Sequence, residues 1–377
     1  MTRATRSAWL ALAVGVFAAG CSKDAATAPT DANVALSRGG EDKGGRDRDR
    51  DDDRDDDRAV TYAVIGDVPY TDSKLNGRPS LPTLIAAINQ DADVRRVIHV
   101  GDIKAGSALC SDSAFQDVAV QFATFTDPLV YMPGDNEWTD CHRANNGGYN
   151  PLDRLAKVHQ LFFPNPGYTL GAAKRIQAQE GYPENQRWEA AGVQFAALHI
   201  IGSNNGRAPW FGDRPAPNTG ETSAETASRE AEYLARNAAN IAWLEKTFRE
   251  AREERSAGIV LFFQADMWHP EDRAAGAQFT AHQDFVARLS QLATAFAPRP
   301  VLLISGDYHE YRVDAGVPWF TTYYNVPAPA NVTQIIIDRS IEINRTGAPD
   351  PTPINYLKLV IDRKAPGVFS WTQVNVQ

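Results

Sequence analysis

Four aspartates of this chain each follow a glycine at the end of a short apolar segment: Asp67, Asp102, Asp135 and Asp307. One Gly-Asp pair is uninformative, because it is also a common turn or helix N-cap. Four such pairs indicate a shared site, since the carboxyl ends of strands in an open α/β sheet meet at one crevice. Carboxylates gathered in one crevice repel one another unless a cation neutralises them, so the pattern predicts a divalent metal site.

The segments that carry the first three aspartates predict strands that alternate with helices. Strands are expected at 60–65, 94–100 and 128–132, which are short apolar runs. Helical spacing of apolar residues is found at 80–90 and 113–125. Strand–loop–helix units in series predict a parallel sheet with right-handed crossovers.

The rest of the chain predicts further helices and strands of one domain, because no repeat and no second linker interrupts it. We expect helices at 152–163 and 223–254, a pair of strands within 188–201, and buried strands at 259–263 and 301–304. From residue 311 onward the strands alternate apolar and polar residues, which predicts an antiparallel closing sheet. Its expected strands are 334–338, 356–362 and 368–376.

Four short blocks resemble, in order, the motifs of calcineurin-like metallophosphoesterases, over residues 60–311. They are Gly66-Asp67, Gly101-Asp102-Ile103-Lys104-Ala105-Gly106, Gly134-Asp135-Asn136-Glu137 and Gly306-Asp307-Tyr308-His309. The resemblance implies an α/β sandwich of two mixed β-sheets flanked by helices. It also implies one or two metal ions and hydrolysis of a small phosphorylated substrate.

Within this resemblance, Asp67 would bind one metal, Asp102 would bridge two, and His309 would complete the first site. Asp135 would bind the second metal. Asp307 stands where the last block has its first histidine, and Gln264 is the aligned candidate for an isolated histidine of the family. Oxygen ligands thus replace imidazoles, which favours Mn²⁺, Mg²⁺, Ca²⁺ or iron over Zn²⁺.

Two departures concern catalysis. Pro69 stands where the first block has a metal-binding histidine, and Asn136 stands at the position of the catalytic histidine. The usual acid that protonates the leaving group is then missing. His142 or His269 could donate the proton instead, although each is also explained as an ordinary surface or supporting histidine.

Two of the three cysteines lie near the predicted site. Cys110 comes eight residues after Asp102, and Cys141 comes six residues after Asp135. In an oxidising compartment such a pair is expected to form a disulfide that restrains both loops. Two free buried thiols are the alternative.

The N-terminus predicts export. Arg3 and Arg6 precede an apolar run that is too short to span a bilayer, so residues 1–20 are expected to be a signal peptide. Residues 18–21 resemble the lipobox of bacterial lipoproteins, in which Cys21 would be lipidated; a plain cleaved signal is the alternative. The polar, charged residues 21–58 predict a disordered tether, followed by the domain 59–377.

These expectations describe an exported, lipid-anchored protein of a bacterial cell envelope. The formal net charge is −9 and no basic stripe is visible, which argues against nucleic acid as the main partner. The leading hypothesis is a metal-dependent hydrolase of a phosphomonoester or phosphodiester. The alternatives are a ligand-binding or degenerate member of the fold and a calcium-stabilised structural lipoprotein.

Overall fold

The computed structural model describes residues 58–70, 80–269, 279–339 and 354–376. All of these residues belong to one compact unit, Asp49–Gln377. The predicted signal peptide, the lipidation site Cys21 and residues 21–57 of the predicted tether lie outside the described residues. They therefore stay predictions.

A six-stranded sheet contains the first three predicted strands. β1 (Val60–Ile65), β2 (Val94–His99) and β3 (Pro128–Tyr131) are parallel, and Ile65 pairs with His99 at their carboxyl ends. The full order is β13-β12-β1-β2-β3-β4, with the antiparallel additions β4 (Leu170–Gly171), β12 (Asn355–Ile361) and β13 (Phe369–Asn375).

Helices cover the outer face of this sheet: α1 (Ser80–Gln90), α2 (Asp112–Phe122) and α3 (Pro151–Phe162). Asn150 caps α3, because its side chain accepts hydrogen bonds from the first backbone N–H groups of the helix. Leu84, Phe115 and Phe122 pack against the sheet in one apolar core. The predicted parallel sheet with its covering helices is thus confirmed.

A second sheet has seven strands in the order β10-β11-β9-β8-β7-β6-β5. The strands are β5 (Gln177–Gln179), β6 (Tyr182–Ala190), β7 (Val193–Ala197), β8 (Gly258–Phe262), β9 (Val301–Ser305), β10 (Arg312–Ala315) and β11 (Val332–Ile336). Its outer face packs on α5 (Ser223–Glu253), α7 (Gln283–Phe296) and α8 (Trp319–Tyr324). The loops add the short helices η1 (Thr139–His142), η2 (Ala144–Asn146), α4 (Gly202–Asn205) and η3 (Thr280–His282).

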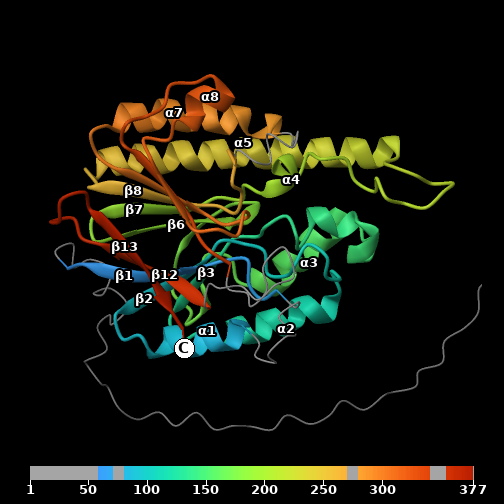
Figure 1. The fold of residues 1–377 in the computed structure, drawn as a ribbon, viewed down its shortest axis with the longest axis horizontal. Helices are drawn as coiled ribbons and strands as arrows, with labels where there is room; N and C mark the ends of the chain where they lie inside the picture. Colours follow the sequence, from blue (N-terminus) through green and yellow to red (C-terminus); the bar gives the residue numbers. More distant parts are fainter. Residues whose placement is uncertain (1–57, 71–79, 270–278, 340–353, 377) are drawn as a thin grey trace, which may run out of the picture. The chain divides into compact units, whose positions relative to one another are not determined.

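The two sheets lie face to face between the helix layers, as Figure 1 shows with α5, α7 and α8 on one side and α1 and α2 on the other. Side chains of both sheets, among them Val64, Ile98, Phe195 and Leu302, form the core between them. Both sheets mix parallel and antiparallel pairs. The predicted sandwich of two mixed β-sheets flanked by helices is confirmed.

The prediction of one antiparallel closing sheet is wrong. β11 is parallel to β9 within the second sheet, whereas β12 and β13 form an antiparallel hairpin on the first. Alternation of apolar and polar residues shows which face of a strand is buried, but not the direction of its neighbour. Four of the five residues of β11 are buried, as is usual for a strand inside a parallel sheet.

Within the described ranges, no helix is both long enough and apolar enough to cross a membrane.

Candidate metal centre

Loops at the carboxyl ends of β1, β2, β3 and β9 bring the four predicted aspartates together. Asp67, Asp102 and Asp135 are buried, and Asp307 is partly buried. The backbone N–H of Asp307 donates to Oδ2 of Asp67 at 3.3 Å, which joins the two sheets at this point. Residues 240 positions apart in the sequence thus belong to one cluster.

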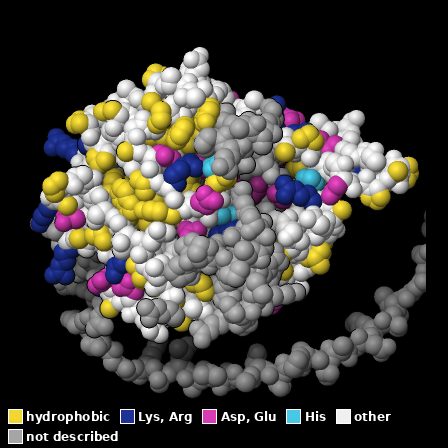
Figure 2. Space-filling model, viewed as in Figure 1, with side chains coloured by type: hydrophobic (Ala, Val, Ile, Leu, Met, Phe, Trp, Pro, Cys, Tyr) yellow, Lys and Arg dark blue, Asp and Glu magenta, His cyan; other side chains and the backbone are white. Residues whose placement is uncertain are grey.

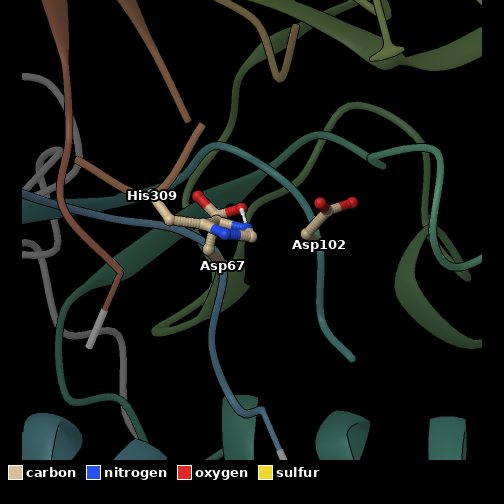
Figure 3. Close-up of side chains that lie close together, drawn as sticks. All are labelled: Asp67, Asp102 and His309. Carbon is tan, nitrogen blue, oxygen red and sulfur yellow. Dashed lines mark ion pairs between the residues drawn. The ribbon is translucent and has the colours of Figure 1, made fainter. Parts of the chain in front are cut away.

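The first group of possible ligands consists of Asp67, Asp102 and His309, whose ligand atoms all lie within 4.8 Å of one another. Nε2 of His309 lies 3.1 Å from Oδ1 of Asp67. Figure 3 shows these two side chains in contact, with the Asp102 carboxylate on the neighbouring loop. This geometry allows one ion to contact an imidazole and two carboxylates.

The second group consists of Asp102, Asp135 and Asp307, again with ligand atoms within 4.8 Å of one another. Asp102 belongs to both groups. A carboxylate has two oxygens, so Asp102 could contact an ion at each group. The cluster therefore offers candidate ligands for one ion, or for two adjacent ions that share Asp102.

Tyr70 lies at the centre of the first group, and the sequence analysis missed it. Its hydroxyl oxygen is 2.8 Å from Nε2 of His309, 3.2 Å from Oδ1 of Asp67 and 3.3 Å from Oδ2 of Asp102. The signal in the sequence is its position three residues after Asp67. It directly follows Pro69, which stands where the family has a histidine.

The electrostatics of the cluster fit a bound cation. Burial, together with the charges of Asp135, Glu137 and Asp67, raises the pKa of Asp102 well above its ordinary value. Burial and the charge of Asp135 do the same to Asp307. Buried like charges of this kind are stabilised by a positive ion, and the donors present are oxygens and one imidazole.

Glycines leave the space that these carboxylates occupy. A Cβ atom on Gly306 would lie 2.3 Å from Oδ2 of Asp67, and one on Gly202 would lie 2.6 Å from Oδ2 of Asp135. Gly134 has the same relation to Asp102. The backbone thus forms a cradle that any larger residue would fill, which also fits a site built to hold a ligand.

Four of the cluster residues adopt a left-handed backbone. The φ angles are +52° for Asp67, +59° for Asp102, +76° for Asp307 and +73° for His309. Such conformations are uncommon outside glycine, and clustered strain of this kind is typical of functional sites. Each of these four residues places a candidate ligand atom in the cluster.

Gln264 also reaches the cluster, but through its nitrogen. Nε2 donates to Oδ2 of Asp102 at 3.2 Å and to Oδ1 of Asp135 at 3.3 Å. Its amide oxygen, the atom that would bind a metal, instead accepts from the backbone N–H of Gly202 at 2.6 Å. In this arrangement Gln264 orients two of the candidate ligands.

The three predicted catalytic residues lie in different surroundings. Asn136 is adjacent to the first group, and its Nδ2 lies 3.4 Å from the Tyr70 hydroxyl. Nδ1 of His142 accepts from the backbone N–H of Phe211, and burial, with Arg143, lowers the pKa of His142 to about 4. His269 stacks on Tyr308, next to Asp307.

Glu137 supports two of the aspartate loops. Its Oε1 accepts from the backbone N–H groups of Asp102 and Gly134, at 3.1 and 2.7 Å, and from the hydroxyl of Tyr131 at 2.8 Å. The buried Lys104 contributes positive charge to the same surroundings. The motifs in the sequence assigned no role to Glu137 or to Lys104.

Cys110 and Cys141 form the predicted disulfide, with their Cα atoms 5.7 Å apart. Both sulfur atoms lie 3.5 Å from the backbone oxygen of Asn136. The disulfide thus packs against the loop that carries Asp135 and Asn136.

A cavity of about 390 Å³ opens beside the second group and is lined in part by Asp307, Ser203 and Arg143. The hydroxyl of Ser203 lies 2.9 Å from Oδ2 of Asp135. Figure 2 shows acidic, basic and histidine side chains gathered near the middle of one face of the molecule. A small molecule in the cavity would lie next to the candidate ligands.

No protein-family model and no curated protein matches this sequence. Among solved structures, a purple acid phosphatase from yellow lupin (Lupinus luteus) seeds has 12% identity and a TM-score of 0.48, over 85% of this chain and 54% of its own. PhoD has 12% identity and a TM-score of 0.47, over 81% and 64%. A 5'-nucleotidase from Candida albicans has 9% identity and a TM-score of 0.38, over 84% and 51%. The chain thus spans only 51% to 64% of the length of these proteins.

Proposed function

We propose that this chain is a metal-dependent hydrolase of a phosphomonoester or phosphodiester. The ligands would be Asp67, Asp102, Asp135, Asp307 and His309. The observation that supports this proposal best is that Asp102 belongs to both groups of ligand atoms. A carboxylate shared by two ions would hold them close together, as phosphoryl transfer with two metals needs.

One or two ions of Mn²⁺, Mg²⁺, Ca²⁺ or iron are proposed rather than Zn²⁺. The candidate donors are carboxylate oxygens and a single imidazole, and sets rich in oxygen favour hard cations. When bound, such ions would neutralise phosphoryl oxygens and lower the pKa of a water molecule.

In the proposed reaction, water attacks phosphorus and the bond between phosphorus and the leaving oxygen breaks. The products from a monoester are an alcohol and inorganic phosphate. Asn136 has an amide that cannot transfer a proton, so it would orient groups near Tyr70. Substrates with good leaving groups should therefore react fastest.

A second candidate is a non-catalytic protein that binds a phosphorylated ligand with the same cluster. Asn136 and the Gln264 amide favour it, because neither supplies the imidazole that the family motifs have at these positions.

Metal analysis and a screen of phosphoesters on the same preparations test the proposal. We expect the parent to bind one or two equivalents of a divalent metal and to hydrolyse at least one ester. Asp102→Asn should lose both properties and stay folded, whereas Asp117→Asn, a change of an exposed residue on α2, should retain both. Metal and ligand binding without turnover would favour the second candidate. A parent that binds no supplied metal would refute the metal-dependent hydrolase.

We also propose that the chain is exported and anchored in a bacterial cell envelope through a lipid on Cys21. The N-terminal pattern of Arg3, Arg6 and an apolar run before Gly20-Cys21 supports it. Mass spectrometry of the mature N-terminus should find a diacylated Cys21, and Cys21→Ala should release the protein from membranes. A parent whose Cys21 carries no lipid, and which is released from membranes as readily as Cys21→Ala, would contradict the anchor.

A further inference from the structure

The cavity beside Asp307 is lined by side chains of both charges. Asp266 and Asp307 lie at the acidic cluster, whereas Arg143 and Arg207 bring positive charge to the same cavity. The volume of about 390 Å³ is near the lower end of the usual range for small-molecule sites, about 300–1,000 Å³. The cavity therefore suits a small ester.

Arg143 is tied to the acidic cluster. Its Nη1 lies 2.7 Å from Oδ2 of Asp140, and its Nη2 lies 3.4 Å from the hydroxyl of Ser203. Ser203 in turn contacts Asp135 at 2.9 Å. Arg143 is thus close to where a phosphoryl group would meet the candidate metal ligands.

A strained turn holds this wall of the cavity in place. Ser203, Asn204 and Asn205 are consecutive left-handed residues, with φ of +51°, +55° and +54°. Such conformations are uncommon outside glycine, so the surrounding structure must hold the turn. Arg236 does so, because it donates to Oδ1 and to the backbone oxygen of Asn205 at 2.6 and 2.8 Å.

Arg207 follows this turn and is anchored on α5. Its Nε donates to Glu230 at 2.9 Å, and its guanidinium lies 5.0 Å from the centre of the Tyr233 ring. Among the described residues, its Nη1 and Nη2 make no hydrogen bond, and the side chain is 40% exposed. Two adjacent N–H donors of this kind bind a carboxylate or a phosphate well.

We infer that the cavity takes the leaving group of a small phosphomonoester that carries a second anionic group, and that Arg207 recognises this group. The inference rests on the proposed function and names its substrate class. The phosphoryl group would lie between the acidic cluster and Arg143. The leaving group would extend along the cavity, so that its own carboxylate or phosphate meets Arg207.

Two substrates with the same carbon chain test this inference on the full-length chain: propyl phosphate and the bisphosphate of 1,3-propanediol. The kcat/KM and the calorimetric Kd would be measured for the parent and for Arg207→Gln. This variant should fold, because Glu230 keeps its ion pair with Arg229 at 2.7 Å. Arg288→Gln is the matched control, since it breaks a similar exposed Arg–Glu pair, with Glu245, on the outer helices.

We expect the parent to prefer the bisphosphate by about tenfold or more, beyond the statistical factor from its two phosphates, as one charge-assisted contact would provide. Arg207→Gln should lose most of this preference, and Arg288→Gln should keep it. Equal kcat/KM and Kd values of the parent for both compounds, or an unchanged preference in Arg207→Gln, would overturn the inference. Binding that depends on Arg207 without cleavage of either alkyl ester would leave the recognition by Arg207 standing, and the screen of phosphoesters with good leaving groups would then decide the proposed hydrolysis separately.

Discussion

A Cβ atom on Gly134 would lie 2.1 Å from Oδ1 of Asp102. Gly306 has the same relation to Asp67, whose Oδ2 would lie 2.3 Å from an added Cβ. The glycine of one Gly-Asp block thus makes room for the aspartate of another block. This packing explains, in physical terms, why glycine precedes the aspartate in these loops.

Replacement of Gly134 by alanine should therefore weaken metal binding. The new methyl group has to displace the Asp102 carboxylate, and displaced ligand surroundings typically reduce metal affinity by about tenfold or more. Competition with a chelator measures the Kd. Gly212→Ala is the control, because nothing lies within 4 Å of an added Cβ there. A Gly134→Ala variant with the parent's Kd would mean that the carboxylate has room to shift without loss.

Gln264→Glu should make the chain depend more strongly on metal. The change replaces an N–H donor to Asp102 and Asp135 with a further carboxylate. Without metal we expect a loss of about 1–3 kcal/mol in the free energy of unfolding, since a buried hydrogen bond becomes a repulsion. A divalent ion should recover most of it, so the increase in Tm upon metal addition should exceed that of the parent.

The control for this variant is Gln160→Glu, which changes an exposed residue of α3 by the same chemistry. Equal unfolding free energies for the parent and Gln264→Glu in chelator would contradict the contact of Gln264 with the two carboxylates.

Tyr70→Phe should weaken metal binding at the first group of ligands and should preserve the fold. The variant keeps the buried ring but removes the hydroxyl that contacts His309, Asp67 and Asp102. We expect a loss of metal affinity of about tenfold or more, as for other groups that orient metal ligands. Isothermal titration with Mn²⁺ measures it, with Tyr168→Phe, an exposed tyrosine, as the control. Unchanged affinity in Tyr70→Phe would assign the hydroxyl to packing alone.

The sequence predicts the framework of this site better than its details. The bounds of β1 and α1 match the predicted segments, because the apolar run of β1 ends at Gly66-Asp67 and that of α1 at Asn89-Gln90. Strand ends also place the four aspartates at one edge. The roles of Tyr70 and Glu137 were missed, since both depend on contacts between loops that no local spacing encodes.

The sequence also could not predict which way the Gln264 amide points. An amide can bind a metal through its oxygen or a carboxylate through its nitrogen, and only the folded neighbourhood decides. The amide oxygen of Gln264 accepts a hydrogen bond from the backbone N–H of Gly202, which leaves the nitrogen for the carboxylates. In the same way, the alternating pattern of 334–338 could not show that β11 runs parallel to β9.

A buried carboxylate outside the metal centre should make stability depend on pH. Glu184 lies between two histidines: its Oε1 is 2.8 Å from Nδ1 of His199, and its Oε2 is 3.0 Å from Nε2 of His159. Burial raises the pKa of Glu184, but the close contacts with His159 and His199 outweigh it and hold the pKa well below its ordinary 4.5. Burial lowers the pKa of His159, but the bond to Glu184 outweighs this effect and raises it above 6.5.

These directions set the pH range in which the pair stabilises the fold. The Glu184 carboxylate has a lowered pKa in the folded state, so its contribution is present above about pH 4.5 and is lost as the pH falls below it. His159 has a raised pKa, so its contribution is complete below about pH 6.5 and is lost as the pH rises through the raised value. Both contributions are present together between these limits.

Glu184→Gln should therefore destabilise the chain most near pH 5.5. We expect a loss of about 1–3 kcal/mol in the free energy of unfolding there, because two buried imidazoles lose a charged partner. The loss should be smaller near pH 9, because the charge on His159 is lost as the pH rises through its raised pKa. Urea unfolding at both pH values measures the difference, and Glu180→Gln, an exposed residue between β5 and β6, should change stability by less than about 0.5 kcal/mol. An equal loss at the two pH values would show that His159 carries no charge in the pair, and that Glu184 acts through neutral hydrogen bonds alone.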